Sequence, residues 1–447
     1  MTEAQIEPIA SNRNTVRELS LRRNFSWTML GNVYYAACQW AILAILAKLG
    51  NTTLVGEFAL AVAIAGPVIT FANLKLRAVQ ASDAKSEYSF GEYLGLRIFT
   101  TPVALLVIAS IVAVSYRSDV GVVILFIGLA KSFETISDIM FGLFQQHEQM
   151  KWIALSQILK GTLSLIVFAG VLTSTESLAL SVAGMAASWA LILLVFDIPV
   201  AASILAHHPK AIRVAFKSIL RPLTPSRDFN RLRQLMWRTL PLGITVLLGS
   251  MSANIPRYFI AGELGTSQLG IFAGMTYVLV AGSLVINALG QSATPRLARY
   301  YAKSDHTAFK SLLLKLILLG AALGMVGIVV AAVAGKQILT LMYSSEYARH
   351  NDVFIWIMVD AAVGYAYVFL GTACSAMRRF TIQLPIHIVT LFALLVFSWM
   401  WIGDYGIKGA AWALLASGMI EATAYSVVVM RALTAGRQPA KSIQDSI

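Results

Sequence analysis

Charged side chains are scarce in this sequence. Only 13% of its 447 residues are charged, 57% are hydrophobic, and the mean hydropathy is +0.71. Soluble domains carry about 25% charged residues, so this chain has too little charge to cover its apolar mass in water. The net charge of +13 fits lysines and arginines that keep loops on the cytoplasmic side of a membrane. We therefore expect a polytopic membrane protein with membrane lipids, and no nucleic acid, as partners.

Cysteine, metal-binding and phosphate-binding motifs are also rare or missing. Cys38 and Cys374 are the two cysteines; they form neither a disulfide framework nor a metal site on their own. The six histidines are scattered, and no Gly-rich loop ends in Lys-Ser or Lys-Thr, which argues against direct ATP use. The longest expected outer segment, near 334–351, is short for a membrane glycosyl transferase. We expect no metal, no cofactor and no enzymatic activity.

Long apolar runs dominate the rest of the sequence. A membrane-spanning helix needs about 20 mostly apolar residues. Twelve runs meet this need: 25–49, 53–75, 93–114, 120–144, 152–173, 178–205, 234–260, 267–293, 309–334, 351–377, 381–402 and 407–431. Lysine and arginine concentrate in alternate loops, which predicts cytoplasmic termini. The fold class expected is an all-α membrane protein with about twelve transmembrane helices.

Two halves of this sequence resemble each other. LGNT at 49–52 leads through GEFA at 56–59 into the second apolar run, and LGTS at 264–267 leads through GIFA at 270–273 into the eighth. Two six-helix units share one orientation, so an axis along the membrane normal would relate them, with a substrate site between them. The predicted parts follow: tail 1–24, N-terminal lobe 25–205, amphipathic cytoplasmic linker 206–232, C-terminal lobe 233–433 and tail 434–447.

Charged residues inside the apolar runs are the first candidate site residues. Charge in a membrane costs about 3 kcal/mol per residue on insertion scales, and it normally faces a cavity or a partner. The spacing of Lys131, Glu134 and Asp138 places them on one helix face, where Glu134 can pair with Lys131. Lys160 lies in the next run and is a candidate substrate contact. Glu134 and Asp138 fit either an ion-coupling site or a structural ion pair. Asp360 and Glu421, single acids in later runs, are further proton or cation candidates.

Two cations late in corresponding runs suggest an anion site. Arg257 lies in the seventh run and Lys48 in the first. Facing cations suit a diphosphate, which arginine grips with two donors. For Lys48 we favour the alternative that it snorkels to the interface. Asn32, Gln39 and Asn254 are amides that would line a polar lumen and bind sugar hydroxyls, or would simply join helices.

The loop after the second run holds a candidate cytoplasmic gate. Asp83 lies near Arg77 and Arg97 in the sequence, and an acid held between arginines can open and close with a conformational change. The alternative, which we favour, is ordinary positive-inside charge with a counter-ion.

Several motifs together resemble a known family. LRAVQASD at 76–83 with Phe90 and Arg97, IPRYF at 255–259, LGIFA at 269–273 and PRLA at 295–298 are similar to the Wzx-type polysaccharide transporters. These oligosaccharide flippases belong to the multidrug/oligosaccharidyl-lipid/polysaccharide (MOP) exporter superfamily, which also contains the MATE transporters. The resemblance implies a V-shaped pair of lobes around a cationic cavity, and it implies Arg257 as a diphosphate contact.

The same resemblance implies a function and a place in the cell. It implies a secondary transporter in the bacterial inner membrane that moves an undecaprenyl-diphosphate-linked oligosaccharide to the periplasmic leaflet for lipopolysaccharide or exopolysaccharide biosynthesis. A polysaccharide polymerase and export machinery would then be partners. Two alternatives stay open. One is a multidrug or cation antiporter of the same superfamily, and the weaker is a membrane glycan polymerase or ligase.

Overall fold

The computed structural model of this chain describes residues 21–83, 86–116, 119–206, 223–379 and 381–435. Its elements are all helical within that part of the chain. They are α1 (Leu21–Leu49), α2 (Thr52–Ala72), α3 (Leu76–Ser82), α4 (Phe90–Ser115), α5 (Asp119–Gln146), α6 (Met150–Thr175), α7 (Leu178–Ile192), the π-helix η1 (Leu193–Asp197), α8 (Ile198–Leu205), α10 (Phe229–Glu263), α11 (Thr266–Tyr277), α12 (Leu279–Ala302), α13 (His306–Met342), α14 (Ser345–Ala348), α15 (Asn351–Ala376) and α16 (Gln383–Ala435).

The expected membrane segments are confirmed as helices. Eleven described helical stretches are long and apolar enough to cross a membrane, and the last of them covers 52 residues. At 1.5 Å per residue, such a stretch would measure about 80 Å, far more than one bilayer. It turns at Gly406, where φ is +61°, a value that glycine adopts without strain.

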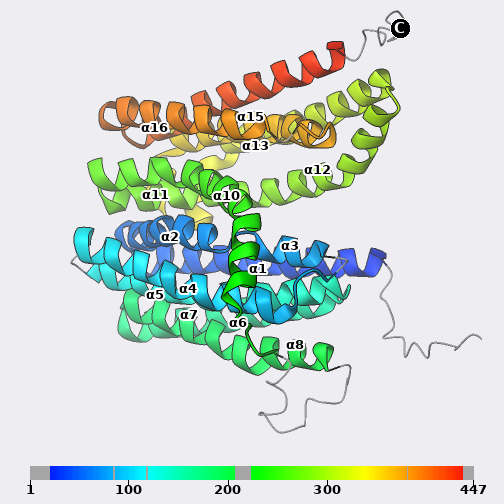
Figure 1. The fold of residues 1–447 in the computed structure, drawn as a ribbon. Coiled ribbons are helices and arrows are strands. Elements are labelled where there is room, and N and C mark those ends of the chain that lie inside the picture. The colour runs from blue at the N-terminus through cyan, green and yellow to red at the C-terminus, as the bar shows by residue number, and fades with distance from the viewer. Residues whose placement is uncertain (1–20, 84–85, 117–118, 207–222, 380, 436–447) are drawn as a thin grey trace, which may run out of the picture.

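The close contact across Gly406 shows that the chain reverses there. A Cβ on Gly409 would lie 2.1 Å from the carbonyl oxygen of Trp401, whereas eight residues of straight helix span about 12 Å. The two arms of α16 are visible as separate orange and red ribbons in Figure 1. The eleven stretches therefore contain the twelve crossings that we expected.

The helices alternate between two ends of the molecule. We call one the Gly50 end, because the turns at Gly50, Gly265 and Gly406 lie there. The other is the linker end, where α1 begins and α8 and α16 end (Figure 1). Most of the predicted amphipathic linker, 207–222, and most of both predicted tails lie outside the described residues. The division into lobes and linker therefore stays a prediction.

Packing differs between these two ends. At the Gly50 end one apolar core joins both halves of the chain, with Trp189 and Phe168 from the first half and Phe272 and Phe354 from the second. At the linker end there are two separate cores. One belongs to the first half and includes Leu235 at the start of α10; the other lies within α12, α13, α15 and α16. The halves are thus held together by apolar packing mainly at the Gly50 end.

The two repeat motifs pack directly against each other at the Gly50 end. A Cβ on Gly56 would lie 1.7 Å from the carbonyl oxygen of Thr266, and one on Gly270 would lie 1.9 Å from that of Thr52. The hydroxyls of Thr52 and Ser267 are 2.7 Å apart. Each glycine therefore lets the backbones of α2 and α11 come into direct contact, with no side chain between them. The contact is reciprocal, as expected for two related motifs that meet around an axis.

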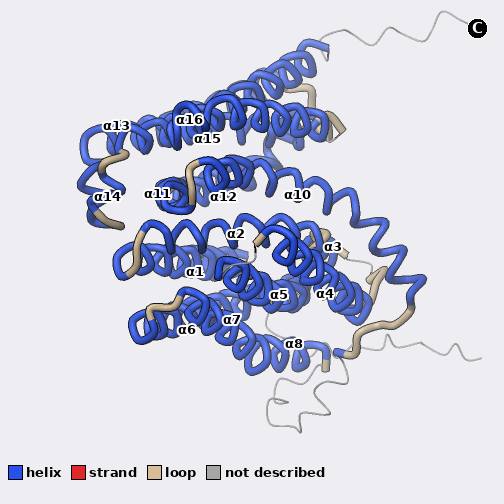
Figure 2. Tube along the Cα trace, turned by 90° about the vertical axis from the view of Figure 1, so that its left-hand side faces the viewer, coloured by secondary structure: helices blue, strands red, loops and turns tan. Residues whose placement is uncertain are grey.

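Helix α10 passes from one half to the other. Its N-terminal part packs on α4 and its later part packs on α2 and α16, and the tube in Figure 2 follows it across the molecule. Pro241 and Pro256 lie inside this helix. Because proline removes a backbone hydrogen bond, these positions allow α10 to bend as it crosses.

Candidate functional site

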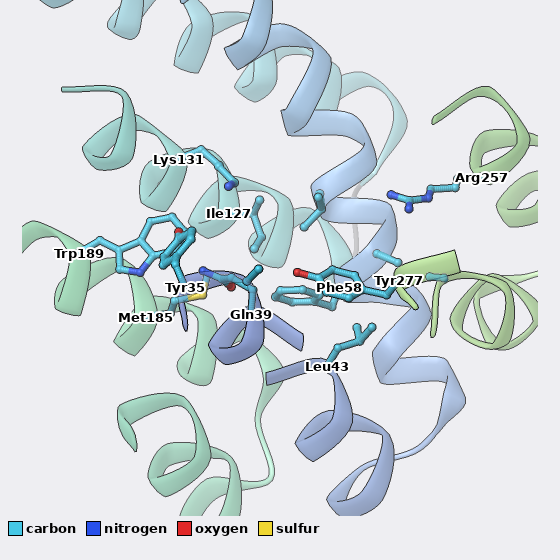
Figure 3. A pocket seen from close by; sticks show the side chains of 14 residues that line it. Tyr35, Gln39, Leu43, Phe58, Ile127, Lys131, Met185, Trp189, Arg257 and Tyr277 are labelled. Carbon is cyan, nitrogen blue, oxygen red and sulfur yellow. The ribbon is translucent and has the colours of Figure 1, made fainter. Parts of the chain in front are cut away.

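A cavity of about 310 Å³ lies between the two halves. Helices α1, α2, α5 and α7 supply one side, and α10 and α11 supply the other (Figure 3). The lining is mainly apolar and aromatic, and three of the lining side chains are neither: Gln39, Lys131 and Arg257. A cavity with aromatic walls and a few converging polar groups is typical of a binding site.

Arg257 points into this cavity from α10 (Figure 3). Its Nη1 donates to Oδ1 of Asn254 at 3.2 Å, and the Nδ2 of Asn254 donates to the carbonyl oxygen of Ser250 at 2.8 Å. Asn254 is buried one turn earlier on the same helix, so it orients the guanidinium. No carboxylate of the described residues lies within ion-pair distance of Arg257. The cation is therefore left to attract an anion from outside the chain.

A second charged group lies across the cavity, on α5. Lys131 Nζ donates to Oε2 of Glu134 at 2.7 Å, and the hydroxyl of Tyr35 donates to Oε1 at 2.8 Å. Lys131 Nζ also lies 5.2 Å from the centroid of the Trp189 ring, a cation–π distance. The expected pairing of Lys131 with Glu134 is present. Because these two charges cancel, Arg257 leaves the cavity with a net positive charge.

Gln39 is the third predicted site residue with a place at this cavity. Its side-chain Nε2 is buried and makes no hydrogen bond to the described chain. An unpaired buried donor is costly, and a bound ligand with acceptor oxygens would satisfy it. The aromatic walls include Phe58 and Tyr277. We did not predict these wall residues, because the sequence of a spanning helix does not distinguish an aromatic residue that faces a cavity from one in the core.

Three other predicted substrate contacts lie elsewhere. Lys48 is exposed in the last turn of α1 at the Gly50 end, and Asn32 is exposed on α1, where its Oδ1 accepts from Gln157. Lys160 is buried in the first half. None of the three lines the cavity between the halves, so the cavity lends no support to their role as substrate contacts.

Lys160 forms a buried ion pair with Asp197. Its Nζ lies 2.7 Å from Oδ2, and the two side chains are 3% and 0% exposed. Asp197 ends the π-helix η1, and Lys160 Nζ lies 5.0 Å from the centroid of the Phe141 ring. Asp197 is a partner that we did not predict, although a lone acid in the apolar run 178–205 is a sequence signal for a buried ion pair.

The predicted gate residues occupy three different settings. Arg77 Nη1 lies 3.1 Å from Oδ1 of Asp138. Arg97 is buried, and its guanidinium donates to Oδ1 and the backbone oxygen of Asn73, which satisfies the C-terminal end of α2. Asp83 bonds neither arginine. The structure therefore does not bring the three side chains into one cluster.

Asp83 organises the loop between α3 and α4. Its carboxylate accepts from the backbone N–H groups of Glu87 and Tyr88 at 2.9 and 3.1 Å, and from the Tyr93 hydroxyl at 3.2 Å. Burial opposes ionisation, but these hydrogen bonds and the charge of Arg238 outweigh it, so the pKa of Asp83 is lowered from its ordinary value. The ionised carboxylate is thus the form that holds this loop.

Two arginines on α10 dock onto the same loop. Arg231 Nε lies 2.8 Å from Oε1 of Glu92, and Arg238 pairs with Glu87. Both guanidinium groups also face the Tyr88 ring. These pairs link α10 to the first half at the linker end. In the sequence both arginines follow the ordinary pattern of positive-inside charge, and no local pattern signals these ion pairs.

The two late acids lie in the second half. Glu421 Oε1 is 3.4 Å from Nδ1 of His387 and lines a second cavity. Asp360 makes no ion pair or hydrogen bond that the described residues show, and its Oδ1 faces Gly418. Across the described residues no three His, Cys, Asp or Glu side chains are grouped to hold a metal ion.

Comparisons with known proteins fit this architecture. The structure is similar to the lipid II flippase MurJ in an inward closed conformation, with a TM-score of 0.67 and 9% identity over 92% of this chain and 89% of that one. It is also similar to an inward-facing multidrug resistance MATE family transporter of the MOP superfamily, with a TM-score of 0.63 and 14% identity over 93% and 96% of the two chains. Together with the twelve crossings, these define a multi-pass membrane protein of the MOP transporter fold.

Sequence comparison places the chain within a family. It is 27% identical over 403 residues to the capsular polysaccharide biosynthesis protein CapF of Staphylococcus aureus, covering 90% of this chain and 98% of that protein. Residues 21–301 match the family described as polysaccharide biosynthesis protein. The chain belongs to this polysaccharide biosynthesis protein family.

Proposed function

We propose that this protein is a secondary transporter that flips an undecaprenyl-diphosphate-linked oligosaccharide from the cytoplasmic to the periplasmic leaflet of the bacterial inner membrane. One observation carries the proposal. The cavity between the halves holds Arg257, a cation without a carboxylate partner among the described residues. A diphosphate supplies the missing negative charge and accepts from both ends of a guanidinium. Family membership supports the same substrate class.

The asymmetry of packing suggests how the head group enters. The halves share one apolar core at the Gly50 end and have separate cores at the linker end. With both termini cytoplasmic, as the loop charges predict, the linker end faces the cytoplasm. The diphosphate and its sugars would enter from that side while the polyprenyl tail stays in lipid. Rocking of one half against the other would then open the Gly50 end.

Ion coupling is the second part of the proposal. Of the four acids that we assign to it, Glu134 is bonded to Lys131 and Tyr35, which both line the cavity between the halves. Asp138, by contrast, is paired with Arg77, and Asp360 and Glu421 lie in the second half. A proton or sodium ion at Glu134 would release Lys131 to the substrate. A polysaccharide polymerase and export machinery would accept the flipped product.

The first test measures the leaflet in which the lipid-linked oligosaccharide accumulates. We expect cells that lack the protein to hold it on the cytoplasmic side, and the wild-type gene to restore translocation. Arg257→Ala should reduce translocation at least about tenfold, because it removes a charged hydrogen-bond donor. Arg299→Ala, which removes an exposed arginine of α12, is the matched control. Normal translocation in the null strain would contradict the flippase, and normal translocation in Arg257→Ala would remove Arg257 from the site.

A drug or cation antiporter is the second candidate, because Glu134 places a carboxylate beside the cavity. Efflux of a cationic dye that depends on this gene, with unchanged surface glycan, would favour it. Glycan chain length in the same strains separates the weakest alternative, a polymerase or ligase. Shortened chains with normal translocation would support that alternative and contradict the flippase.

A further inference from the structure

A second cavity, of about 330 Å³, lies entirely within the second half, between α12, α15 and α16. Its character differs from that of the first cavity. Amide, hydroxyl and tyrosine side chains dominate the lining, and no lysine or arginine of the described residues contributes. The proposed flippase function assigns no role to this second cavity.

Several lining groups have hydrogen-bonding capacity to spare. The side chain of Gln291 and the hydroxyl of Tyr367 make no hydrogen bond that the described residues show, although both line the cavity. Asn287 uses only its Nδ2, which donates to the carbonyl oxygen of Ser283 at 2.8 Å. The amide oxygen of Asn287 is left for a ligand. Such a wall offers both donors and acceptors, which a hydroxyl group can use in either sense.

The charge of this second cavity argues against a phosphate. Glu421 is 8% exposed and lies 3.4 Å from His387, and the ring of His387 contacts the hydroxyl of Tyr425 at 3.4 Å. The described lining includes this carboxylate and no lysine or arginine, so it offers an anion no fixed positive charge. The rings of Tyr367 and Tyr425 offer apolar faces. An uncharged ligand rich in hydroxyls, with an apolar ring face, matches this lining; a sugar residue has this chemistry.

The position of the second cavity relative to the first also matters. Tyr277, the last residue of α11, lines the first cavity, and Asn287 on α12 lines the second. Ten residues of helix cover about 15 Å, and α12 runs from there towards the linker end. The two cavities are therefore about 15 Å apart along these helices, a separation that the sugars of a lipid-linked oligosaccharide held at Arg257 can span.

We propose that the second cavity binds a sugar residue of the lipid-linked oligosaccharide while Arg257 holds the diphosphate. This inference rests on the proposed flippase function and adds to it that two separate cavities bind two parts of the same lipid. The Arg257 cavity recognises the part that all such lipids share, and the second cavity recognises the glycan. Selectivity among glycans then arises from α12, α15 and α16.

Binding to the purified full-length protein in detergent tests the division with two probes. One is undecaprenyl diphosphate without sugar, and the other is the lipid-linked oligosaccharide extracted from cells that lack this protein. We expect Gln291→Ala and Tyr367→Ala each to weaken binding of the sugar-bearing lipid about tenfold, because each removes ligand contacts. Binding of undecaprenyl diphosphate should not change. Arg257→Ala should weaken both probes.

Controls separate the failure of this inference from the failure of the flippase. Thr423→Ala, on the exposed face of α16 between Glu421 and Tyr425, should leave both affinities unchanged. Tyr367→Phe keeps the ring and serves as a second variant if Tyr367→Ala fails to fold. If the wild type binds neither probe, the proposed function is contradicted. If it binds both, and the α12 and α15 variants weaken both equally or neither, the sugar site alone is overturned.

A cationic ligand is the remaining competitor for this space. Binding of a cationic dye that is lost in Glu421→Gln, with sugar-lipid affinity unchanged in that variant and in Gln291→Ala, would assign the second cavity to cations. That result would overturn the sugar site and leave the Arg257 contact intact.

Discussion

Lys160 and Arg257 are both cations within membrane-spanning helices, and their surroundings differ. Lys160 is packed inside the first half, bonded to Asp197, with both side chains almost fully buried. Arg257 faces a cavity between the halves, and its one described hydrogen bond is to the neutral Asn254. The first cation is neutralised by the chain itself. The second needs a partner that the described chain does not supply, and this difference separates a structural charge from a binding charge.

The largest expected effect comes from breaking the neutralised pair. Lys160→Met should lower the free energy of unfolding by about 3–5 kcal/mol, because it leaves Asp197 as an uncompensated buried charge. Removing both charges in Lys160→Met with Asp197→Leu should recover most of this loss. Denaturant unfolding in detergent measures it, with Lys315→Met, at an exposed lysine of α13, as control. A single variant as stable as the wild type would show that Lys160 is not a structural charge.

The next effect concerns the close contact between α2 and α11 at the Gly50 end. Gly270→Val should cost about 1–3 kcal/mol, because its side chain overpacks a close helix contact; even a Cβ there would lie 1.9 Å from the Thr52 carbonyl oxygen. Gly262→Val, at a position with open space around its Cβ, should cost much less. Thermal unfolding of the two variants compares them. Equal midpoints would mean that α2 and α11 separate easily.

The charge balance of the cavity gives a smaller effect. Glu134→Gln removes the carboxylate that neutralises Lys131 and should tighten the binding of inorganic pyrophosphate about threefold to tenfold, since a unit charge nearby changes the energy of an anion by about 1 kcal/mol. Lys131→Gln should weaken it. Asp404→Asn, at an exposed acid of the Gly50 end, is the control. If the first two variants changed affinity in the same direction, net charge would not govern binding here.

The smallest effect is the pH dependence of the Asp83 loop. Because the pKa of Asp83 is lowered in the folded protein, its carboxylate stabilises the fold at pH values above its ordinary pKa of 3.8, and this contribution is lost as the pH falls through the lowered value. Asp83→Asn should therefore unfold at a lower temperature than the wild type at neutral pH and converge with it in acid. A constant gap between the two melting curves from neutral to acid pH would contradict this.

The sequence located the helices well and their partners poorly. The twelve apolar runs appear in the structure with small shifts, including the reversal at Gly406 between the last two. The ion pairs of Arg231 and Arg238 on α10 with Glu92 and Glu87 could not be predicted from the sequence. Both arginines follow the ordinary pattern of positive-inside charge. The structural role of Lys160 is hidden in the sequence for a similar reason: its partner, Asp197, is 37 residues away, and helical spacing does not predict contacts at that separation.

The sequence by itself determined that this is a membrane protein, where its helices lie, and that two repeated motifs recur in its halves. It could do so because each spanning segment must satisfy its own backbone hydrogen bonds in lipid, which makes helix formation a local property of the apolar run. Only the tertiary structure decided which charges are neutralised within the chain and which face a cavity. That distinction depends on distances between residues of different helices, such as Lys160 and Asp197, and no local pattern contains them.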